Sequence, residues 1–273
     1  MGSSTSSPRT RSVPDKRKSH IELVCIFSDI HFDMEHKPLW KAAREWHAQY
    51  KPDRTIFSGD FVDFGMLSTK YQVQSKEPLH AISQLKRWIT EANGISKESG
   101  KTIAITGNHE DRWSKYINGS TPWALDGALG LDLHSQALYH GLNKNIEWNE
   151  EDVDNPGVKV GQFWLRHGHK QIHGGPFAGS GHPAVRRLRE SHGRSEMIGH
   201  HHRVMMANHT AYGETQTILT LPTMVGNMKY AGPDPNWQRG WTVVEVDDDF
   251  AWPNTILWNQ GRAVYNRQVY TGK

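Results

Sequence analysis

The sequence predicts an α/β protein whose first half is built around parallel strands. Three short apolar runs, at 21–27, 54–57 and 101–105, have the length and the β-branched content of buried strands. Helix-like stretches at 39–50 and 77–93 separate these runs. Strands that alternate with helices in this way are typical of βαβ units, in which consecutive strands are parallel.

Both predicted helices carry one apolar face. Pro38 opens the first helix, and proline suits the first turn because it lacks a backbone donor. Apolar side chains recur at helical spacing at Trp40, Ala43, Trp46 and Tyr50, and again at Leu79, Ile82, Leu85, Trp88 and Ile89. Gly94 predicts the end of the second helix. We expect both apolar faces to pack on a core.

The second half of the chain is rich in short strands with short links. We predict strands at 158–166, 196–198, 215–221, 241–246 and 265–270. A basic stretch at 183–191 predicts one short helix. Because so little helix separates the strands, we expect the second sheet to be mixed or antiparallel.

The segment at 112–157 has no clear periodicity. Trp113, Trp123 and Trp148 predict that it packs on the rest of the chain as an insertion or cap. Its acidic end, at 149–155, predicts a solvated loop.

The charge distribution separates a tail from a body. Residues 1–20 are rich in Ser, Pro, Arg and Lys, which predicts a disordered basic tail before a domain at 21–273. The tail has five basic residues and one acidic residue, a net +4, so the body carries −1 of the overall +3. The body therefore lacks the basic excess of many nucleic-acid binders, and nucleic acid is not the favoured partner.

The chain has one cysteine, Cys25, inside an apolar run. It cannot form an intramolecular disulfide, which favours a reducing compartment, and we expect a cytoplasmic protein. No apolar run approaches the roughly 18 residues of a membrane span, so we expect no membrane partner. The sequence leaves the oligomeric state open.

Side chains that bind metals follow five of the predicted strands. They are Asp29 with His31, Asp60, Asn108, His167, and His200 with His202. The set mixes imidazole and oxygen ligands with no thiolate, which suits Mn, Fe or Zn. Seven ligands exceed what one tetrahedral zinc needs, and they match two ions that share a bridging carboxylate.

The pair Asp29 and His31 is two residues apart. In an extended segment, residues i and i+2 point to the same side, so both side chains are expected to reach one ion. By the same alternation, we expect His201, between His200 and His202, to point away.

The five motifs occur in a defined order. They are Asp29-Ile30-His31, Gly59-Asp60-Phe61-Val62-Asp63, Gly107-Asn108-His109-Glu110, His167-Gly168-His169 and Gly199-His200-His201-His202. This order resembles that of the calcineurin-like metallophosphoesterases, and the segment at 221–246 resembles the C-terminal part of phage and bacterial members. The resemblance implies an α/β fold with four layers, an α/β/β/α sandwich with two mixed β-sheets, formed by residues 21–273.

The resemblance also implies how the ligand residues share two ions. Asp29, His31 and His202 would bind one metal, Asn108, His167 and His200 would bind the other, and Asp60 would bridge them. The implied cofactors are two ions, Mn first, with Fe or Zn as alternatives. A hydroxide that bridges the metals would attack phosphorus.

Three further residues receive implied roles or alternatives. His109 would not be a ligand but would protonate the leaving oxygen, with Asp63 or a neighbouring residue orienting it. Protein phosphatases of this superfamily carry an arginine where this chain has Phe64, and another just before the Gly-Asn-His-Glu motif. Arg112 would either substitute for one of these arginines or form an exposed salt bridge.

We therefore expect a dinuclear metal-dependent phosphodiesterase that hydrolyses small phosphodiesters, such as cyclic nucleotides. The alternatives are an Mre11-like DNA nuclease, a phosphomonoesterase and a non-catalytic scaffold. All seven ligand positions and His109 are filled, which argues against a scaffold.

Other polar residues near the motifs have simpler interpretations. We expect His169 and His173 to lie in a solvent-facing loop. We expect a solvated helix face for the basic residues Arg186, Arg187, Arg189 and Arg194.

Overall fold

The computed structural model describes residues 20–68, 78–120, 130–152, 155, 157–170, 183–191, 193–228 and 235–273. The predicted tail before His20, together with Trp123 and His173, lies outside these residues. Among the helices that are described, none combines the length and the apolarity that crossing a membrane requires.

The first sheet contains, within the described residues, six strands in the order β11-β10-β1-β2-β3-β4. Their bounds are β1 Glu22–Phe27, β2 Arg54–Ser58, β3 Lys101–Ile105, β4 Glu147–Asn149, β10 Gly240–Asp247 and β11 Phe250–Leu257. Strands β1 to β4 pair in parallel, and β10 and β11 extend the sheet antiparallel on the other side of β1. The predicted parallel half is confirmed, and β4 and β11 add two strands to those predicted.

Two helices connect the first three parallel strands, α1 (Lys37–Tyr50) and α2 (Pro78–Glu98). The Nδ1 atom of His36 accepts the backbone N–H of Leu39 at 3.2 Å and so caps the first turn of α1. The predicted helix end at Gly94 is wrong. Helix α2 continues past it because Ile95, which is fully buried, extends the apolar face that packs on the core.

The second sheet has the strand order β5-β6-β7-β9-β8 within the described residues. Its strands are β5 Val158–Val160, β6 Phe163–Arg166, β7 Ser195–Ile198, β8 Met205–Ala211 and β9 Glu214–Thr220. The pairs β6–β7 and β7–β9 are parallel, whereas β5 and β8 pair antiparallel, so the expected mixed sheet is confirmed.

Two predicted strands are hairpins instead. The stretch at 158–166 turns at Gly161, whose φ of +54° suits a residue without a Cβ, and its two halves become β5 and β6. The stretch at 265–270 turns at Asn266 and Arg267, with φ of 47° and 65°, and separates β12 (Ala263–Tyr265) from β13 (Gln268–Tyr270). Two consecutive left-handed residues are the signature of a tight hairpin turn.

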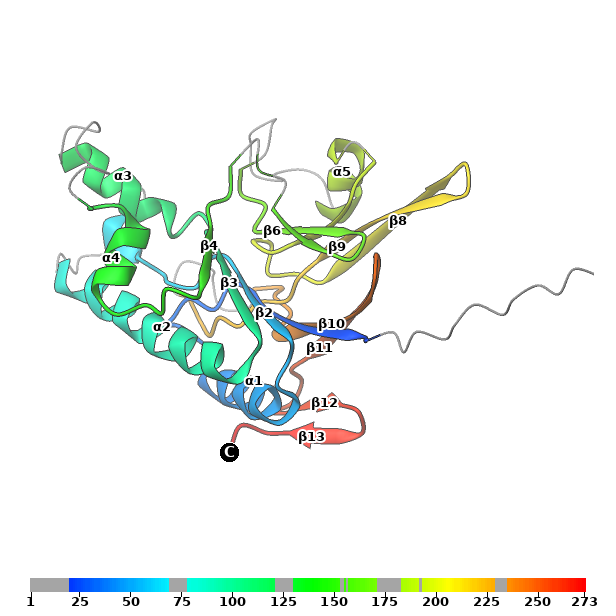
Figure 1. Cartoon of the computed structure of the whole chain (residues 1–273), viewed down its shortest axis with the longest axis horizontal. Helices are drawn as coiled ribbons and strands as arrows, with labels where there is room; N and C mark the ends of the chain where they lie inside the picture. The colour runs from blue at the N-terminus through cyan, green and yellow to red at the C-terminus, as the bar shows by residue number, and fades with distance from the viewer. Residues whose placement is uncertain are drawn as a thin grey trace, which may run out of the picture.

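Alternate residues of the first sheet face two different cores. Phe27 on one face packs in the cluster that includes Trp46 of α1 and Trp88 of α2. Ile26 on the other face packs in the cluster that includes Leu165 of the second sheet. The first sheet therefore lies between the helices and the second sheet (Figure 1).

The outermost layer is helix α5 (Pro183–Glu190), which covers the far face of the second sheet (Figure 1). Ala184 of α5 packs with Ile198 of β7 and Ile218 of β9. The predicted four-layer α/β/β/α sandwich is confirmed. The expected solvated position of Arg187 is wrong, because its side chain is buried and its Nη2 atom donates to Glu196 at 2.8 Å.

The described parts of the segment at 112–157 pack on the rest of the chain, as predicted, and one of them adds strand β4 to the first sheet. The segment contains most of α3 (Asp111–Ser120), α4 (Leu133–Tyr139) and strand β4. The ring of Trp148 in β4 lies 5.9 Å from the rings of both Phe61 and Trp88. Trp113 of α3 is also buried and tilts against Phe64.

Candidate metal centre

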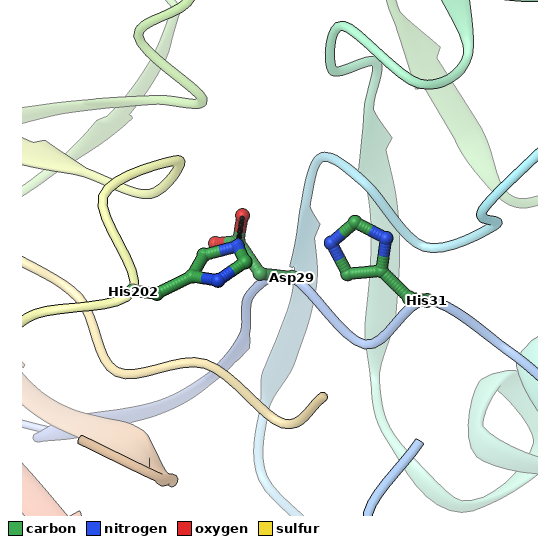
Figure 2. A group of neighbouring side chains, drawn as sticks. All are labelled: Asp29, His31 and His202. Atoms are coloured by element: carbon green, nitrogen blue, oxygen red, sulfur yellow. Dashed lines mark hydrogen bonds and ion pairs between the residues drawn. The ribbon is translucent and has the colours of Figure 1, made fainter. Parts of the chain in front are cut away.

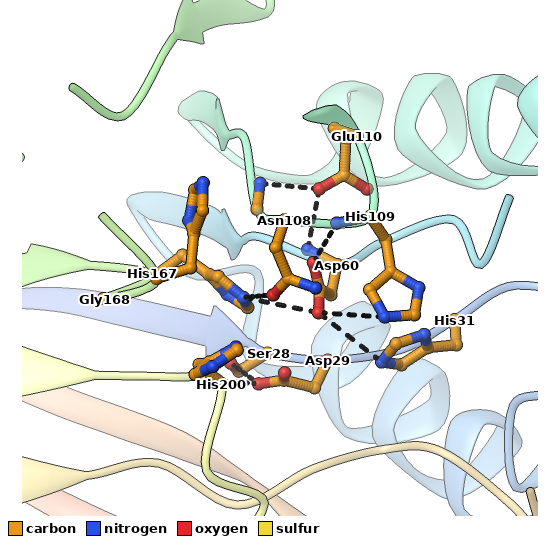
Figure 3. A network of polar contacts seen from close by, with 12 residues as sticks. Ser28, Asp29, His31, Asp60, Asn108, His109, Glu110, His167, Gly168 and His200 are labelled. Carbon is orange, nitrogen blue, oxygen red and sulfur yellow. Dashed lines mark hydrogen bonds and ion pairs between the residues drawn. The ribbon is translucent and has the colours of Figure 1, made fainter. Parts of the chain in front are cut away.

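Every predicted metal ligand lies just past the carboxyl end of a strand. The residues that follow β1, β2 and β3 of the first sheet are Asp29, His31, Asp60 and Asn108. Those that follow β6 and β7 of the second sheet are His167, His200 and His202. Because the two sheets pack face to face, their strand ends meet and these side chains converge (Figure 2 for His202, Figure 3 for the others).

The loop after β1 does not have the extended geometry expected for the Asp29 and His31 pair. Their φ angles are 52° and 51°, and that of Asp60 is 49°, so all three are left-handed. The backbone N–H of Asp29 donates to the carbonyl of Gly59 at 3.2 Å, and that of His31 donates to the carbonyl of Asp60 at 3.0 Å. These bonds between loops hold a conformation that non-glycine residues rarely adopt.

Two glycines allow the close approach of the loops. A Cβ atom on Gly59 would lie 2.4 Å from the ring of His167, and one on Gly107 would lie 2.3 Å from Oδ1 of Asp60. Any larger residue would push the ligands apart, so both motif glycines are required by space.

The carboxylate of Asp60 lies at the centre of the cluster. Its Oδ1 atom accepts the backbone N–H of His109 at 2.9 Å. Its Oδ2 atom faces three imidazole nitrogens, at 3.3 Å from His167, 3.7 Å from His109 and 3.9 Å from His31. An oxygen that faces rings from both sheets has the position that a bridging ligand needs (Figure 3).

The first ligand group consists of Asp29, His31 and His202. One ligand atom from each lies within 4.8 Å of the others, and all three residues are buried (Figure 2). The Nε2 atom of His202 is 3.1 Å from Oδ1 of Asp29. The other carboxylate oxygen of Asp29 accepts the backbone N–H of His200 at 3.0 Å.

The second ligand group consists of Asp60, His167, His200 and Asn108. The ligand atoms of its acidic and histidine members also lie within 4.8 Å of one another. The Oδ1 atom of Asn108 is 3.2 Å from Nε2 of His167. The Nδ1 atom of His167 lies 3.0 Å from the carbonyl of Ser58, to which it donates, so Nε2, which faces Asn108 and Asp60, is the nitrogen that would bind a metal.

The charge states of these residues fit metal binding. Burial, and next the nearby ring of His109, lower the pKa of His31 to about 4. Burial and the ring of His167 lower the pKa of His200 to about 3. Both rings are therefore neutral near pH 7 and keep a lone pair for a cation. Neither ring nitrogen of the fully buried His31 makes a hydrogen bond within the described residues, and a metal ligand would satisfy one of them.

The acidic members are ionised. Burial opposes ionisation, but the ring of His202 keeps the pKa of Asp29 below its ordinary range, and the rings of His109 and His167 do the same for Asp60. Asp60 in turn raises the pKa of His167 against the effect of burial, so a proton competes with a metal for this ring.

The ring of His109 has Asp60 near its Nε2 atom and Asp63 near its Nδ1 atom. Its Nδ1 atom is 2.7 Å from the carbonyl of Asp63 and 3.2 Å from the carboxylate of the same residue. Burial lowers the pKa of His109, but the charges of Asp60 and Asp63 outweigh this, and the pKa is raised overall. A protonated ring with Nε2 directed at the cluster is the form that a general acid requires.

Arg112 contacts both Asp63 and His109. Its Nη1 atom donates to the carbonyl of Asp63 at 2.6 Å, and its Nη2 atom lies 3.0 Å from Nε2 of His109. The second bond forms only when Nε2 is unprotonated. Arg112 therefore stabilises the neutral form of His109, whereas the carboxylates stabilise the charged form.

Glu110 joins the loops that carry the ligands. Its carboxylate accepts the backbone N–H of Asp60 at 2.9 Å (Figure 3). It also accepts the backbone N–H groups of Val62 at 3.1 Å and Gly107 at 2.6 Å. It thereby fixes the loop after β2 to the loop after β3. Its position in the Gly-Asn-His-Glu motif identifies Glu110 as a candidate site residue. The sequence does not show that its carboxylate binds backbone N–H groups rather than a metal.

Glu151 is a supporting residue that the sequence reasoning missed. The prediction of a solvated acidic loop is wrong at this position, because Glu151 is 0% exposed. Its carboxylate accepts the N–H of Gly168 at 2.8 Å and lies 3.1 Å from Nη2 of Arg166. It is therefore hydrogen-bonded to the residues on both sides of His167. The backbone N–H of Glu151 donates to Thr106 at 3.1 Å. The run of acidic residues around it hides this role in the sequence.

The histidines next to the ligands differ from expectation in one case. The side chain of His169 is only 7% exposed, and its Nε2 atom is 3.1 Å from Asp111, so the expected solvent-facing position is wrong. His201 belongs to neither ligand group. Its neighbours His200 and His202 are left-handed, with φ of 66° and 57°, so strand alternation does not explain its orientation.

Comparison with known families agrees with this geometry. The profile described as calcineurin-like phosphoesterase matches residues 23–210, which include every ligand motif. The chain therefore belongs to the calcineurin-like phosphoesterase family, and the predicted resemblance is confirmed. Membership supports hydrolysis of phosphoric esters, and with the His/Asp clusters it suggests a dinuclear site for divalent metals.

Several solved structures are similar to this chain, whereas no curated protein matches it. Vps29 from Chaetomium thermophilum is 7% identical, with 92% of this chain and 100% of that chain covered and a TM-score of 0.48. Vps29 from Cryptosporidium parvum is 13% identical, with 92% and 98% covered and a TM-score of 0.47. A dimetal phosphatase from Danio rerio is 12% identical, with 86% and 95% covered and a TM-score of 0.44. At these values the similarity carries no conclusion about activity.

Proposed function

We propose that this protein is a phosphodiesterase that uses two divalent ions, Mn in the first instance, to hydrolyse small phosphodiesters. The observation that carries the proposal is the placement of His109. Its Nε2 atom lies 3.7 Å from the carboxylate oxygen that faces both ligand groups. His109 also lies in a third group of possible ligands, with His31 and Asp63. We assign it to proton transfer because the carbonyl of Asp63 holds its Nδ1 atom at 2.7 Å. The ring is therefore available to protonate a leaving group at the metal centre.

In this proposal Asp63 and Arg112 control the position and protonation of His109, while the metal ions activate water. When bound, two divalent ions lower the pKa of a coordinated water and neutralise phosphoryl oxygens. Asp63 holds the Nδ1–H of His109 with its carbonyl, which directs Nε2 toward the leaving oxygen. After His109 gives up the Nε2 proton, the guanidinium of Arg112 donates to the neutral ring and stabilises it.

The polar contacts of Arg112 favour diesters over monoesters. A monoester dianion gains most from guanidinium groups that are free to bind its oxygens. Both terminal nitrogens of Arg112 already contact Asp63 and His109, and Phe64 occupies the position of a second arginine in related protein phosphatases. A diester needs the proton from His109 more than it needs these cations.

The charge of the body favours small substrates over long nucleic acids. Residues 21–273 carry about −1 overall, so no general basic excess supports a polyanion. We treat these residues as one catalytic unit because β10 and β11, which lie beyond the family match, complete the first sheet.

The test is a substrate panel after metal removal. The full chain is treated with a chelator, reloaded separately with Mn, Fe or Zn, and assayed with a cyclic nucleotide, a nitrophenyl diester, a nitrophenyl monoester and single-stranded DNA. We expect activity only after reloading, highest kcat/KM on a diester, and Mn as the best metal. A monoester as the best substrate would refute the diester proposal, and DNA as the best substrate would favour a nuclease.

A further inference from the structure

A cavity of about 300 Å³ lies beside the first ligand group. The described residues that line it are Trp237, Gln238, Arg239, Leu257, Trp258 and Asn259, and we call it the indole pocket. Strand β10 starts at Gly240 and runs antiparallel to β1, and Gly240 pairs with Leu257 at the end of β11. The pocket therefore lies at the same edge of the first sheet as the ligands that follow β1.

One wall of the pocket is fixed to a metal ligand. The ring of Trp237 meets the ring of His202 edge to face, with 4.6 Å between centroids. The backbone N–H of Gln238 donates to the carbonyl of His202 at 2.9 Å, and the side chain of Gln238 accepts the N–H of Val204 at 3.1 Å. A ligand in the pocket would therefore be separated from His202 of the first ligand group by the indole of Trp237.

The lining favours a flat, neutral ring with hydrogen-bonding edges. Trp237 and Trp258 contribute their indoles to the lining, and Asn259 contributes an amide. The ring of Trp258 also meets the ring of His36, with 5.7 Å between centroids. The guanidinium of Arg239 donates to the carbonyls of Val225 at 2.8 Å and Gly226 at 3.0 Å, so its charge is directed at backbone. Apolar walls with a few polar groups are typical of small-molecule sites, and aromatic rings stack well on nucleobases.

We propose that the indole pocket binds the nucleobase of a nucleotide while the phosphate lies on the two ligand groups. This inference rests on the proposed function and narrows its substrate class to small phosphodiesters that carry one nucleobase. The volume is at the lower limit of typical ligand pockets, which suits one ring system rather than a polymer.

The test compares two probes that differ only in the base. AMP and ribose 5-phosphate are titrated calorimetrically into the full chain loaded with Mn. We expect AMP to bind roughly 5- to 100-fold more tightly, the range that stacking of one base on an aromatic ring provides. In Trp258→Ala, the affinity for AMP should fall to that for ribose 5-phosphate. Trp252→Ala removes an exposed indole of β11 outside the pocket and should keep the preference.

The outcomes separate this inference from the proposed function. Equal affinities of the wild-type chain for AMP and ribose 5-phosphate would overturn the inference without any variant. A preference for AMP that persists in Trp258→Ala would overturn the assignment to this pocket. If the preference depends on Trp258 but no diester is hydrolysed in the substrate panel, the pocket stands and the phosphodiesterase proposal fails.

Discussion

The two ligand groups differ in what holds their side chains in place. In the second group, His167 donates to Ser58, and Glu151 binds the residues on both sides of it. In the first group, neither ring nitrogen of His31 has a hydrogen-bond partner in the described part of the chain, and its Nδ1 atom lies 3.4 Å from the carboxylate of Asp63. The ring of His202 packs on the ring of Trp237. The protein therefore orients His167 of the second group by its own bonds, whereas His31 of the first group depends more on a bound metal.

This difference predicts that the two ions bind in sequence. Hydrogen bonds to ligands outside the metal shell lower the cost of arranging a site, so the second group should bind first and more tightly. Asp60 belongs to both events because its Oδ2 atom faces His167 and His31. Substitutions at Asp60, at His109 and at Glu151 should therefore affect metal content and turnover in different ways.

The largest effect is expected for Asp60→Ala. If Asp60 bridges two ions, its removal deprives both groups of a ligand, so we expect loss of most bound metal and activity at the level of the metal-free chain. Elemental analysis after reloading with excess Mn, alongside activity, measures this. At most one ion per wild-type chain under these conditions would contradict the dinuclear assignment.

Replacement of the proposed acid should separate activity from metal content. In His109→Ala we expect turnover to fall about 10²- to 10⁴-fold, because that is the usual contribution of a general acid or base. Metal content should stay at two ions. His209→Ala, an exposed histidine of β8, is the matched control and should behave as wild type. Loss of metal in His109→Ala would show that this ring is a ligand.

Substitution of Glu151, which holds the residues on both sides of His167, tests whether the protein's own bonds orient the second ligand group. Glu151→Gln removes the charge that pairs with Arg166 but keeps an acceptor for Gly168. We expect the affinity for one ion to fall about 10- to 100-fold, as is typical when support around a ligand is lost. The affinity for the other ion should change little. Glu150→Gln, at the exposed neighbouring position, is the control.

Calorimetric titration with Mn distinguishes the two steps in Glu151→Gln. If both steps weaken equally, Glu151 supports the whole fold rather than the second group. If thermal stability falls in the chelated variant as well, the buried ion pair with Arg166 contributes to folding, and the two effects are separated by comparing metal-free and loaded samples.

The comparison also explains what could be predicted from the sequence. Ligands such as Asp29 and His167 occur in short motifs after apolar runs, and the sheet edge brings them together by topology. Glu151 acts through backbone and through Arg166, contacts that depend on the distance between segments in space. No local pattern distinguishes it from the exposed Glu150 beside it.

The same limit applies to the secondary structure. Buried strands were predictable because they are short continuous apolar runs, and amphipathic helices because burial of one face imposes a period of 3.6 residues. The edge strand β8 has only one buried position, Ala207, so its pattern shows no apolar face. The left-handed turns at Gly161 and Asn266 interrupt runs that read as single strands, since turn geometry and not hydrophobicity decides them.

The smallest effect is expected for Arg112→Lys, and it tests whether Arg112 binds phosphate or positions His109. Arg112 donates to Asp63 with one nitrogen and contacts His109 with the other, a pair of contacts that the single ammonium of lysine cannot reproduce. Loss of one such hydrogen bond corresponds to about a fivefold change. We expect kcat to fall by about this factor for the nitrophenyl diester and monoester alike, with KM nearly unchanged. If Arg112 bound phosphate instead, the dianionic monoester would lose more than the diester, and its KM would rise. Arg203→Lys, at an exposed position, serves as the control. Equal loss on both substrates therefore assigns Arg112 to His109, whereas selective loss on the monoester assigns it to the substrate.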